Sequence, residues 1–151
     1  MVGRSEAGDS VKPAHTKYRL ARPGGEYNRL YALMQREMGI REPLGWPVVV
    51  AERDGRVVGF LGTAARDDVL IAGPLVIEGG RNPIMFLHLT EAYENVLRLA
   101  SINSYYFTVD EGNFEQVARV KSLGIPQVGQ DKNKLIFLRE LKWLVAAGQH
   151  K

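Results

Sequence analysis

The sequence predicts a single α/β (α+β) domain in which strand-like and helix-like segments alternate. Three observations carry this prediction. The chain has 151 residues and 45% hydrophobic content, which suits one buried core. Two β-rich runs are separated by Asp54-Gly55, a pair that favours a tight antiparallel turn. Two segments with helical periodicity each begin beside an asparagine able to cap a helix, Asn82 and Asn113.

The elements follow from apolar periodicity and from breaker residues. We expect strands at residues 17–22, 48–52, 56–63, 69–77, 105–109 and 134–142, and helices at 27–38, 83–101 and 113–123.

Breakers mark the ends of several elements. Pro23-Gly24-Gly25 stops the first strand, and Gly39 is a suitable C-terminal stop for the first helix. Pro43, Gly45 and Pro47 leave little room for a further helix before the hairpin. Pro74 cannot donate a ladder hydrogen bond, so its strand is predicted to lie at an edge or to contain a bulge or break there.

The second helix is predicted to be amphipathic, with Asn82 as its N-cap and Pro83 in its first turn. Its expected apolar face consists of Met85, Leu89, Ala92, Tyr93, Val96 and Ala100. Its expected solvent face consists of His88, Glu91, Glu94, Asn95 and Arg98. His88 is therefore interpreted as a solvated histidine rather than a catalytic one.

Composition limits the classes of function. The absence of cysteine excludes disulfides, thiolate zinc sites and a cysteine nucleophile, and the three histidines are too scattered for a metal cluster. The first ten residues lack the apolar core of a signal peptide, and no apolar run is long enough to span a bilayer. We expect a cytoplasmic protein with no membrane partner and no metal.

The basic charge is concentrated near the N-terminus. Residues 1–41 carry eight Lys or Arg and four Asp or Glu, whereas residues 42–151 carry twelve and thirteen. We expect residues 1–15 to form a disordered basic arm and residues 16–151 to form the domain. Nucleic-acid binding through residues 4–22 remains an alternative, but no basic stripe with interleaved aromatics supports it elsewhere.

The run Asn113-Phe-Glu-Gln-Val-Ala-Arg-Val-Lys-Ser-Leu-Gly-Ile125 resembles the last core helix of the GNAT superfamily of acyl-CoA-dependent N-acetyltransferases. That helix often begins with Asn and ends in Leu-Gly-Phe. Arg81 lies 32 residues before Asn113, where the family's acyl-CoA loop, Arg/Gln-x-x-Gly-x-Gly/Ala, starts. The predicted order of elements also matches the family over residues 17–142. The resemblance implies a mixed, mostly antiparallel central sheet flanked by helices.

The resemblance also implies where a cofactor binds. In the family, a bulged strand diverges from the next one and binds pantetheine through its backbone, and Gly73-Pro74 supplies a cause for such a bulge. The following helix N-terminus receives a phosphate, to which Arg81 adds a charge. The residues implied to bind acetyl-CoA are Leu75, Val76, Gly80, Arg81, Asn82, Ile84, Met85, Phe86 and Asn113. Alternatively, Gly79-Gly80 is only a turn and Asn82-Pro83 only a helix start.

The sequence departs from the family at chemically important positions. Ile84 and Phe86 replace the small residues of the loop, and Val120 stands where the family commonly has a tyrosine general acid. Glu52, Glu78 and Asp110 are candidate bases, but solvated carboxylates are the simpler interpretation, so the catalytic residues stay unknown. We expect weak binding of acetyl-CoA.

Two functions follow from the resemblance. The first is transfer of an acetyl group from acetyl-CoA to an amine on a small molecule or protein. The second is a catalytically silent binding or regulatory protein; GNAT-like proteins with eroded loops occur in phage genomes, where a host protein is a natural target. A homodimer is compatible with both.

Overall fold

The computed structural model describes residues 15–66 and 68–141, so residues 1–14 of the predicted arm lie outside the described residues. The elements in chain order are β1 (Thr16–Leu20), α2 (Gly25–Met38), β2 (Leu44–Arg53), β3 (Arg56–Ala64), β4 (Ala72–Ile77), α3 (Pro83–Leu99), β5 (Ser104–Asp110), α4 (Phe114–Ser122), β6 (Gln127–Asp131) and β7 (Lys134–Glu140). The predicted order is confirmed, with one additional strand, β6.

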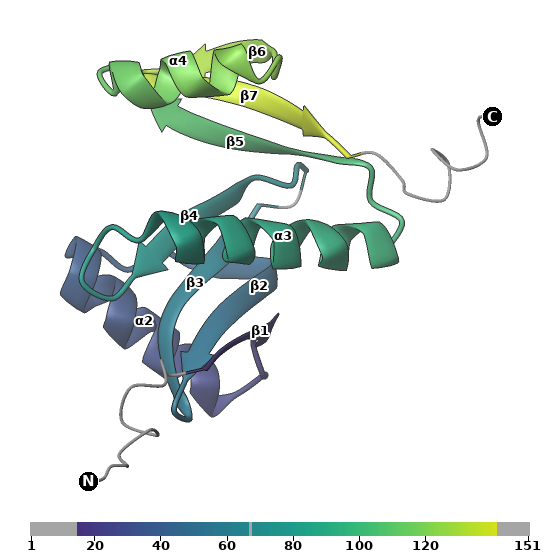
Figure 1. Ribbon diagram of the computed structural model, residues 1–151. Helices are drawn as coiled ribbons and strands as arrows, with labels where there is room; N and C mark the ends of the chain where they lie inside the picture. The colour runs from purple at the N-terminus through teal and green to yellow at the C-terminus, as the bar shows by residue number, and fades with distance from the viewer. Residues whose placement is uncertain (1–14, 67, 142–151) are drawn as a thin grey trace, which may run out of the picture.

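The strands form two antiparallel sheets, one ordered β1-β2-β3-β4 and the other β5-β7-β6. The hairpin between β2 and β3 turns at Asp54 and Gly55, whose φ angles are 54° and 75°, as the Asp-Gly pair predicts. The two sheets touch through an isolated parallel bridge between Ile71 and Tyr106. The expected mixed, mostly antiparallel arrangement is thus confirmed, and it is split between β4 and β5 (Figure 1).

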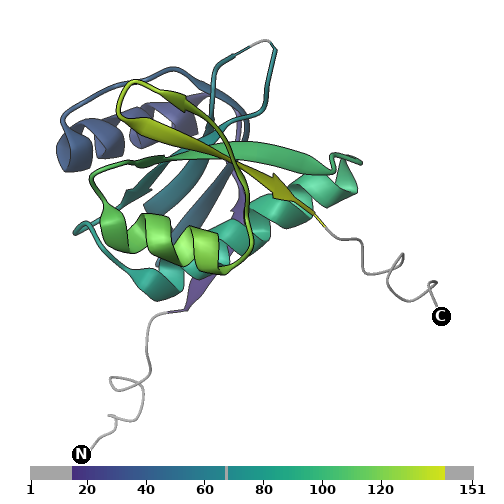
Figure 2. The ribbon, with the colours of Figure 1, turned by 90° about the horizontal axis from the view of Figure 1, so that it is seen from above.

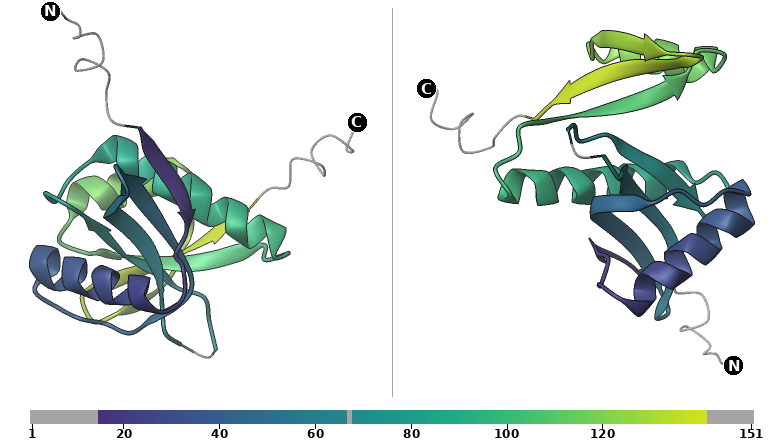
Figure 3. Two further views of the ribbon diagram at one scale, coloured as in Figure 1. Left: turned by 90° about the horizontal axis from the view of Figure 1, so that it is seen from below. Right: turned by 180° about the vertical axis from the view of Figure 1, so that it is seen from behind.

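Helices α2 and α3 cover opposite faces of the first sheet (Figure 3). The alternation of side chains along each strand separates two cores. Val48, Val50, Phe60 and Val76 pack with Leu30, Leu33 and Met34 of α2, whereas Val49, Ala51, Leu61 and Ile77 pack with Met85, Leu89, Tyr93 and Leu97 of α3. This explains why β2 and β3 are continuously apolar rather than alternating.

Helix α4 packs on the second sheet. Val120 of α4 is buried with Val109, Leu135 and Phe137, and Phe107 contacts this cluster as well as the α3 core. The helix begins at the predicted place, because the Asn113 side chain accepts a hydrogen bond from the Gln116 N–H at 3.2 Å. It ends as predicted before Gly124, whose φ is 79°.

The structure corrects the predicted solvent face of α3. Glu94 is buried, at 6% exposure, and accepts hydrogen bonds from the Tyr105 hydroxyl at 2.6 Å and the Arg139 Nε at 3.0 Å. The buried stripe runs through positions 85, 89, 93 and 97 with Glu94 beside it. A carboxylate can lie there because β5 and β7 bring it a phenol and a guanidinium.

Candidate functional site

The candidate site is the edge of β4 that faces β5. The Tyr106 N–H donates to the Leu70 carbonyl at 2.9 Å, and the Ile71–Tyr106 bridge follows directly. Beyond this point β4 pairs with β3 on one side, and within the described residues no strand pairs with its other side. The two strands separate toward their C-terminal ends (Figure 1). We call this divergence between Ala72–Ile77 and Ser104–Asp110 the slot.

A bulge marks the start of the slot. Leu61 pairs with Leu75 and Thr63 with Ala72, so Gly73 and Pro74 both oppose Gly62. Pro74 has no N–H to give to the ladder, and Gly73 takes a φ of 125°, a conformation that side chains disfavour. The predicted bulge at Gly73-Pro74 is confirmed.

The antiparallel ladder determines which backbone groups face the slot. The Glu78 N–H donates to the Val58 carbonyl at 2.9 Å, and Val76 pairs with Phe60 two residues along. Because hydrogen-bonded and non-hydrogen-bonded pairs alternate, the N–H groups of Leu75 and Ile77 point away from β3. The sequence implies Leu75 and Val76 as a pair, but the ladder directs only the Leu75 N–H into the slot, and that of Val76 belongs to the sheet.

The loop after β4 leads into α3 through two glycines. Gly79 and Gly80 have φ angles of 81° and 95°, and the Gly80 N–H donates to the Ile77 carbonyl at 2.8 Å. These are turn-forming conformations that a side chain would strain. Gly80 thus serves the turn, which agrees with the simpler of its two interpretations.

The start of α3 satisfies part of its own hydrogen-bond donors. Pro83 has no N–H, and the Asn82 side chain accepts from the Met85 N–H at 3.1 Å. The Phe86 N–H donates to the Asn82 carbonyl at 2.9 Å. Of the four positions whose N–H groups a helix leaves unpaired, 82 to 85 here, Asn82 and Ile84 have an N–H without a hydrogen bond among the described residues. An anion at this helix end would compete with the asparagine cap.

The side chains around the loop are mostly apolar and exposed. Ile84 is 70% exposed, Phe86 40% and Leu87 54%. Arg81 is exposed at the start of the loop. The N-termini of α3 and α4 lie at the same end of the molecule (Figure 2), where Phe114 is 79% exposed. Exposed hydrocarbon therefore occurs at the N-terminal ends of both helices.

Helix α4 contributes a helix cap and a core residue at the two positions of interest, and Val120 cannot serve as a general acid. The Asn113 side chain is engaged as a cap, and Val120, at 4% exposure, fills the core beneath β5.

The hydroxyl groups of two tyrosines near the sheet are hydrogen-bonded to buried side chains. The Tyr93 hydroxyl contacts that of Thr63 at 2.6 Å, and burial raises the pKa of Tyr93 to about 12. Burial likewise raises the pKa of Tyr105, which donates to Glu94.

The candidate carboxylate bases are all ion-paired. Glu52 accepts from Arg19 at 2.8 Å, Glu78 accepts from Arg36 and Arg56, and Asp110 accepts from Lys134 at 2.9 Å. The hydrogen bond from Arg19 lowers the pKa of Glu52, and the hydrogen bond from Arg56 lowers that of Glu78. These pairs make both groups weaker bases than free carboxylates. The interpretation as structural surface carboxylates is supported.

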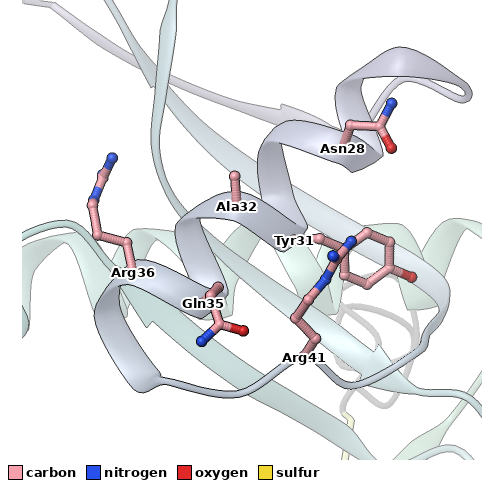
Figure 4. Close-up of a pocket in the computed structure, with 6 residues that line it drawn as sticks. All are labelled: Asn28, Tyr31, Ala32, Gln35, Arg36 and Arg41. Carbon is pink, nitrogen blue, oxygen red and sulfur yellow. The ribbon is translucent and has the colours of Figure 1, made fainter.

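Other surface features lie away from the slot. A shallow hollow on α2 is lined by Asn28, Tyr31, Ala32, Gln35, Arg36 and Arg41, with the Arg41 guanidinium 5.2 Å from the Tyr31 ring (Figure 4). His88 is exposed, in agreement with its predicted place on the solvent face, and its Nδ1 lies 3.3 Å from a Glu91 carboxylate oxygen. No metal-binding group of His, Cys, Asp or Glu occurs in the described ranges. None of the helices described there is long and apolar enough to cross a membrane.

Solved structures resemble the whole described domain. The ribosomal-protein-S18-alanine N-acetyltransferase from Escherichia coli matches with a TM-score of 0.67 and 12% identity over 85% of this chain and 96% of that one. The aminoglycoside 6'-N-acetyltransferase from Enterococcus faecium matches with a TM-score of 0.61 and 14% identity, over 84% and 98%. No family model and no curated protein sequence matches the chain.

A third match has coenzyme A bound. The N-acetylglutamate synthase from Neisseria gonorrhoeae, solved with coenzyme A and N-acetyl-glutamate, matches with a TM-score of 0.63 and 16% identity over 87% of this chain and 36% of that one. At such identities the likeness concerns the fold. The chain has the fold of the GNAT N-acetyltransferases, as the resemblance in its sequence predicted.

The two ends of coenzyme A fit this structure unequally. The open edge of β4 offers backbone groups that an amide-containing pantetheine arm can pair with. The pyrophosphate end does not fit, because Pro83 and the Asn82 cap occupy the helix start and Ile84 and Phe86 border it.

Proposed function

We propose that the chain is an N-acetyltransferase that moves an acetyl group from a pantetheine thioester, with acetyl-CoA as the expected donor, to an amine. The observation that carries this proposal is the unpaired edge of β4 beyond the Gly73-Pro74 bulge. The fold shared with N-acetyltransferases supports it.

The residues proposed to bind the donor divide into two groups. Leu75 would contribute its outward N–H, whereas Val76 and Met85 would shape the slot from the two cores in which they are buried. Gly80, Arg81, Asn82, Ile84, Phe86 and Asn113 would border its mouth. The thioester supplies an activated acyl group when bound.

The residues that could act on a proton are few. We propose none of the three candidate carboxylates as the base, since Glu52, Glu78 and Asp110 are each ion-paired. The amine would therefore have to arrive neutral, and catalysis would come from positioning and from fixed backbone donors.

The experiment is to replace Leu75 with proline and, as a matched control, with alanine. Both variants lose the leucine side chain, but only proline removes the N–H that points into the slot, and that N–H makes no bond to β3. We expect acetyl-CoA-dependent release of free thiol in the presence of an amine, and loss of at least tenfold of this activity in Leu75→Pro relative to Leu75→Ala. Equal activity in the two folded variants would contradict the proposed slot.

The amine panel follows from the similar structures. It includes an aminoglycoside and an alanine amine, the acceptor types that the names of two similar enzymes give. An amide-resolved NMR titration with acetyl-CoA provides a readout that needs no acceptor. We expect shifts at Leu75 and Ile77 that exceed the shift at Val76.

A second function is favoured by a different observation. The self-capped start of α3 and the ion-paired carboxylates are also what a GNAT-fold protein without catalysis would show. Such a binding or regulatory protein would give no thiol release with any amine and no amide shifts in the slot.

A further inference from the structure

We propose that the slot recognises its donor through the pantetheine arm alone, so that the nucleotide end of coenzyme A contributes almost nothing to binding. This inference rests on the proposed function. It deepens that function by naming the donor class as acyl-pantetheine thioesters, whether the pantetheine belongs to free coenzyme A or is carried on a protein.

Few N–H groups at the start of α3 are free to bind an anion. A helix N-terminus binds phosphate through its unpaired N–H groups. Here Pro83 removes one and the Asn82 side chain occupies that of Met85 at 3.1 Å, so only the N–H groups of Asn82 and Ile84 are left among the first four. To reach the Met85 N–H, a pyrophosphate would have to displace the Asn82 side chain. The hydrogen bond lost by Asn82 would offset much of the one gained by the pyrophosphate.

The second step is steric and chemical. Ile84 and Phe86 carry large side chains at the start of α3, and both are exposed together with Leu87. Bulky hydrocarbon beside a doubly charged group keeps water from it without supplying hydrogen bonds in return. Arg81 is the nearest cation in sequence, but an exposed arginine is screened by solvent and holds a phosphate weakly when the backbone does not assist.

The third step is that the pantetheine half of the site is intact. The bulge at Gly73-Pro74, the separation of β5 from β4, and the outward N–H of Leu75 do not depend on the loop. The pantetheine arm contains two amides, which can pair with a strand edge as another strand would. The part of the site that would present the thioester is therefore open, whereas the part that would bind phosphate is partly occupied by the Asn82 cap.

The exposed apolar rim bears on the source of the donor. Ile84, Leu87 and Phe114 are 70%, 54% and 79% exposed at the end of the molecule where α3 and α4 begin. A carrier protein that presents acyl-phosphopantetheine would cover hydrocarbon there, whereas free coenzyme A would not. The shared chemistry is the acyl-pantetheine arm, and the source is decided by the experiment.

The experiment compares three donors with the native protein: acetyl-CoA, acetyl-pantetheine and acetylated holo acyl carrier protein. We expect acetyl-CoA and acetyl-pantetheine to have dissociation constants within about threefold, because one charge-assisted phosphate contact alone would favour acetyl-CoA by about tenfold or more. A preference of tenfold or more for acetyl-CoA would overturn the inference while leaving the proposed function intact. Binding of none of the three would overturn both.

The carrier protein separates the two sources. A lower dissociation constant for the acetylated carrier protein than for acetyl-pantetheine would support recognition of the arm and identify a protein-borne donor. Equal use of both would support the arm alone as the recognised group.

A variant tests the cause. The double change Asn82→Ala and Ile84→Gly frees the Met85 N–H and removes bulk at the mouth. We expect it to shift the ratio of the two dissociation constants toward acetyl-CoA by about tenfold, with acetyl-pantetheine binding as the internal control. The melting temperature establishes that the variant is folded. If the native protein shows a ratio near one but the folded variant does not move it, the self-capped helix start does not cause the lack of preference, and the proposed role of Asn82 and Ile84 is wrong.

Discussion

Arg19 of β1 holds two carboxylates from different elements, Glu26 of α2 and Glu52 of β2. Its Nη atoms bond both oxygens of Glu26 at 2.7 and 2.8 Å, and its Nε bonds Glu52 at 2.8 Å. The Arg22 N–H also donates to Glu26 at 2.7 Å. The pair therefore ties β1 to the start of α2 and to β2. Bidentate geometry of this kind is among the stronger ion pairs in proteins.

This pair gives a pH dependence of stability. The hydrogen bond from Arg19 lowers the pKa of Glu26 from its ordinary 4.5 to about 2. Since the folded pKa lies below the unfolded one, the stabilisation is fully present above about pH 5 and is lost as the pH falls toward 2. We expect Glu26→Gln to lower the free energy of unfolding by about 2 kcal/mol at pH 7.

Urea unfolding between pH 7 and pH 2 measures this effect. The difference between native protein and Glu26→Gln should shrink over that range, as native Glu26 takes up a proton. Glu91→Gln is the control, because the Glu91 side chain is 62% exposed and should change stability by less than about 0.5 kcal/mol. If the difference in unfolding free energy between the two proteins stays constant down to pH 2, Glu26 stabilises the fold through packing and not through its charge.

Two properties of single residues, the occupied Met85 N–H and the burial of Glu94, could not be predicted from the sequence. That Asn82 caps and Pro83 opens α3 is predictable from residue types alone. That the cap also occupies the Met85 N–H needed by an anion follows only from the 3.1 Å contact. The burial of Glu94 is likewise hidden, because its partners Tyr105 and Arg139 are eleven and 45 residues away.

At the scale of elements, predictability follows the strength of local signals. The hairpin at Asp54-Gly55 and the ends of α2 and α4 at Gly39 and Gly124 were predictable, because each requires positive φ at a glycine. Strand β6 was not, because Gln127–Asp131 has no apolar alternation and lies mostly exposed on the sheet edge. Its pairing with β7 comes from chain reversal at Lys132 and Asn133.

Helix α4 depends on its cap. Only Val120 of its residues is buried, so the helix has little packing to hold its first turn. We expect Asn113→Ala to lower the free energy of unfolding by about 1 kcal/mol through loss of the bond to the Gln116 N–H. Thermal unfolding measures the change. The matched control is Asn28→Ala, the same substitution at an exposed interior position of α2, where alanine should be neutral or slightly stabilising. Equal effects at the two positions would argue against a capping role.

At the scale of the molecule, the slot leaves the two sheets with little backbone pairing between them. In the part of the chain that the structure describes, the two sheets pair only at the bridge between Ile71 and Tyr106, so the strands themselves hold the halves together weakly. Side chains that pack against both cores join the two halves. Phe107 packs against the α3 core and against the α4 core, stacks on Phe137 at 5.5 Å and lies 6.3 Å from Tyr105.

Phe107 is thus expected to join the two halves. Replacing it with alanine should remove about 2–3 kcal/mol of stability, somewhat less than for a fully buried phenylalanine because Phe107 is only partly buried. The matched control is Phe114→Ala, since Phe114 is 79% exposed and should cost less than about 0.5 kcal/mol.

Hydrogen exchange distinguishes a joint from an ordinary core residue. If Phe107 couples the halves, its loss should leave the amides of β2 and β3 protected while those of β5 and β7 exchange faster, because the second sheet opens on its own. Uniform loss of protection across both sheets would mean that the molecule unfolds as one unit and that the slot is held by other contacts. A cost as small as that of Phe114→Ala would contradict the role of Phe107 altogether.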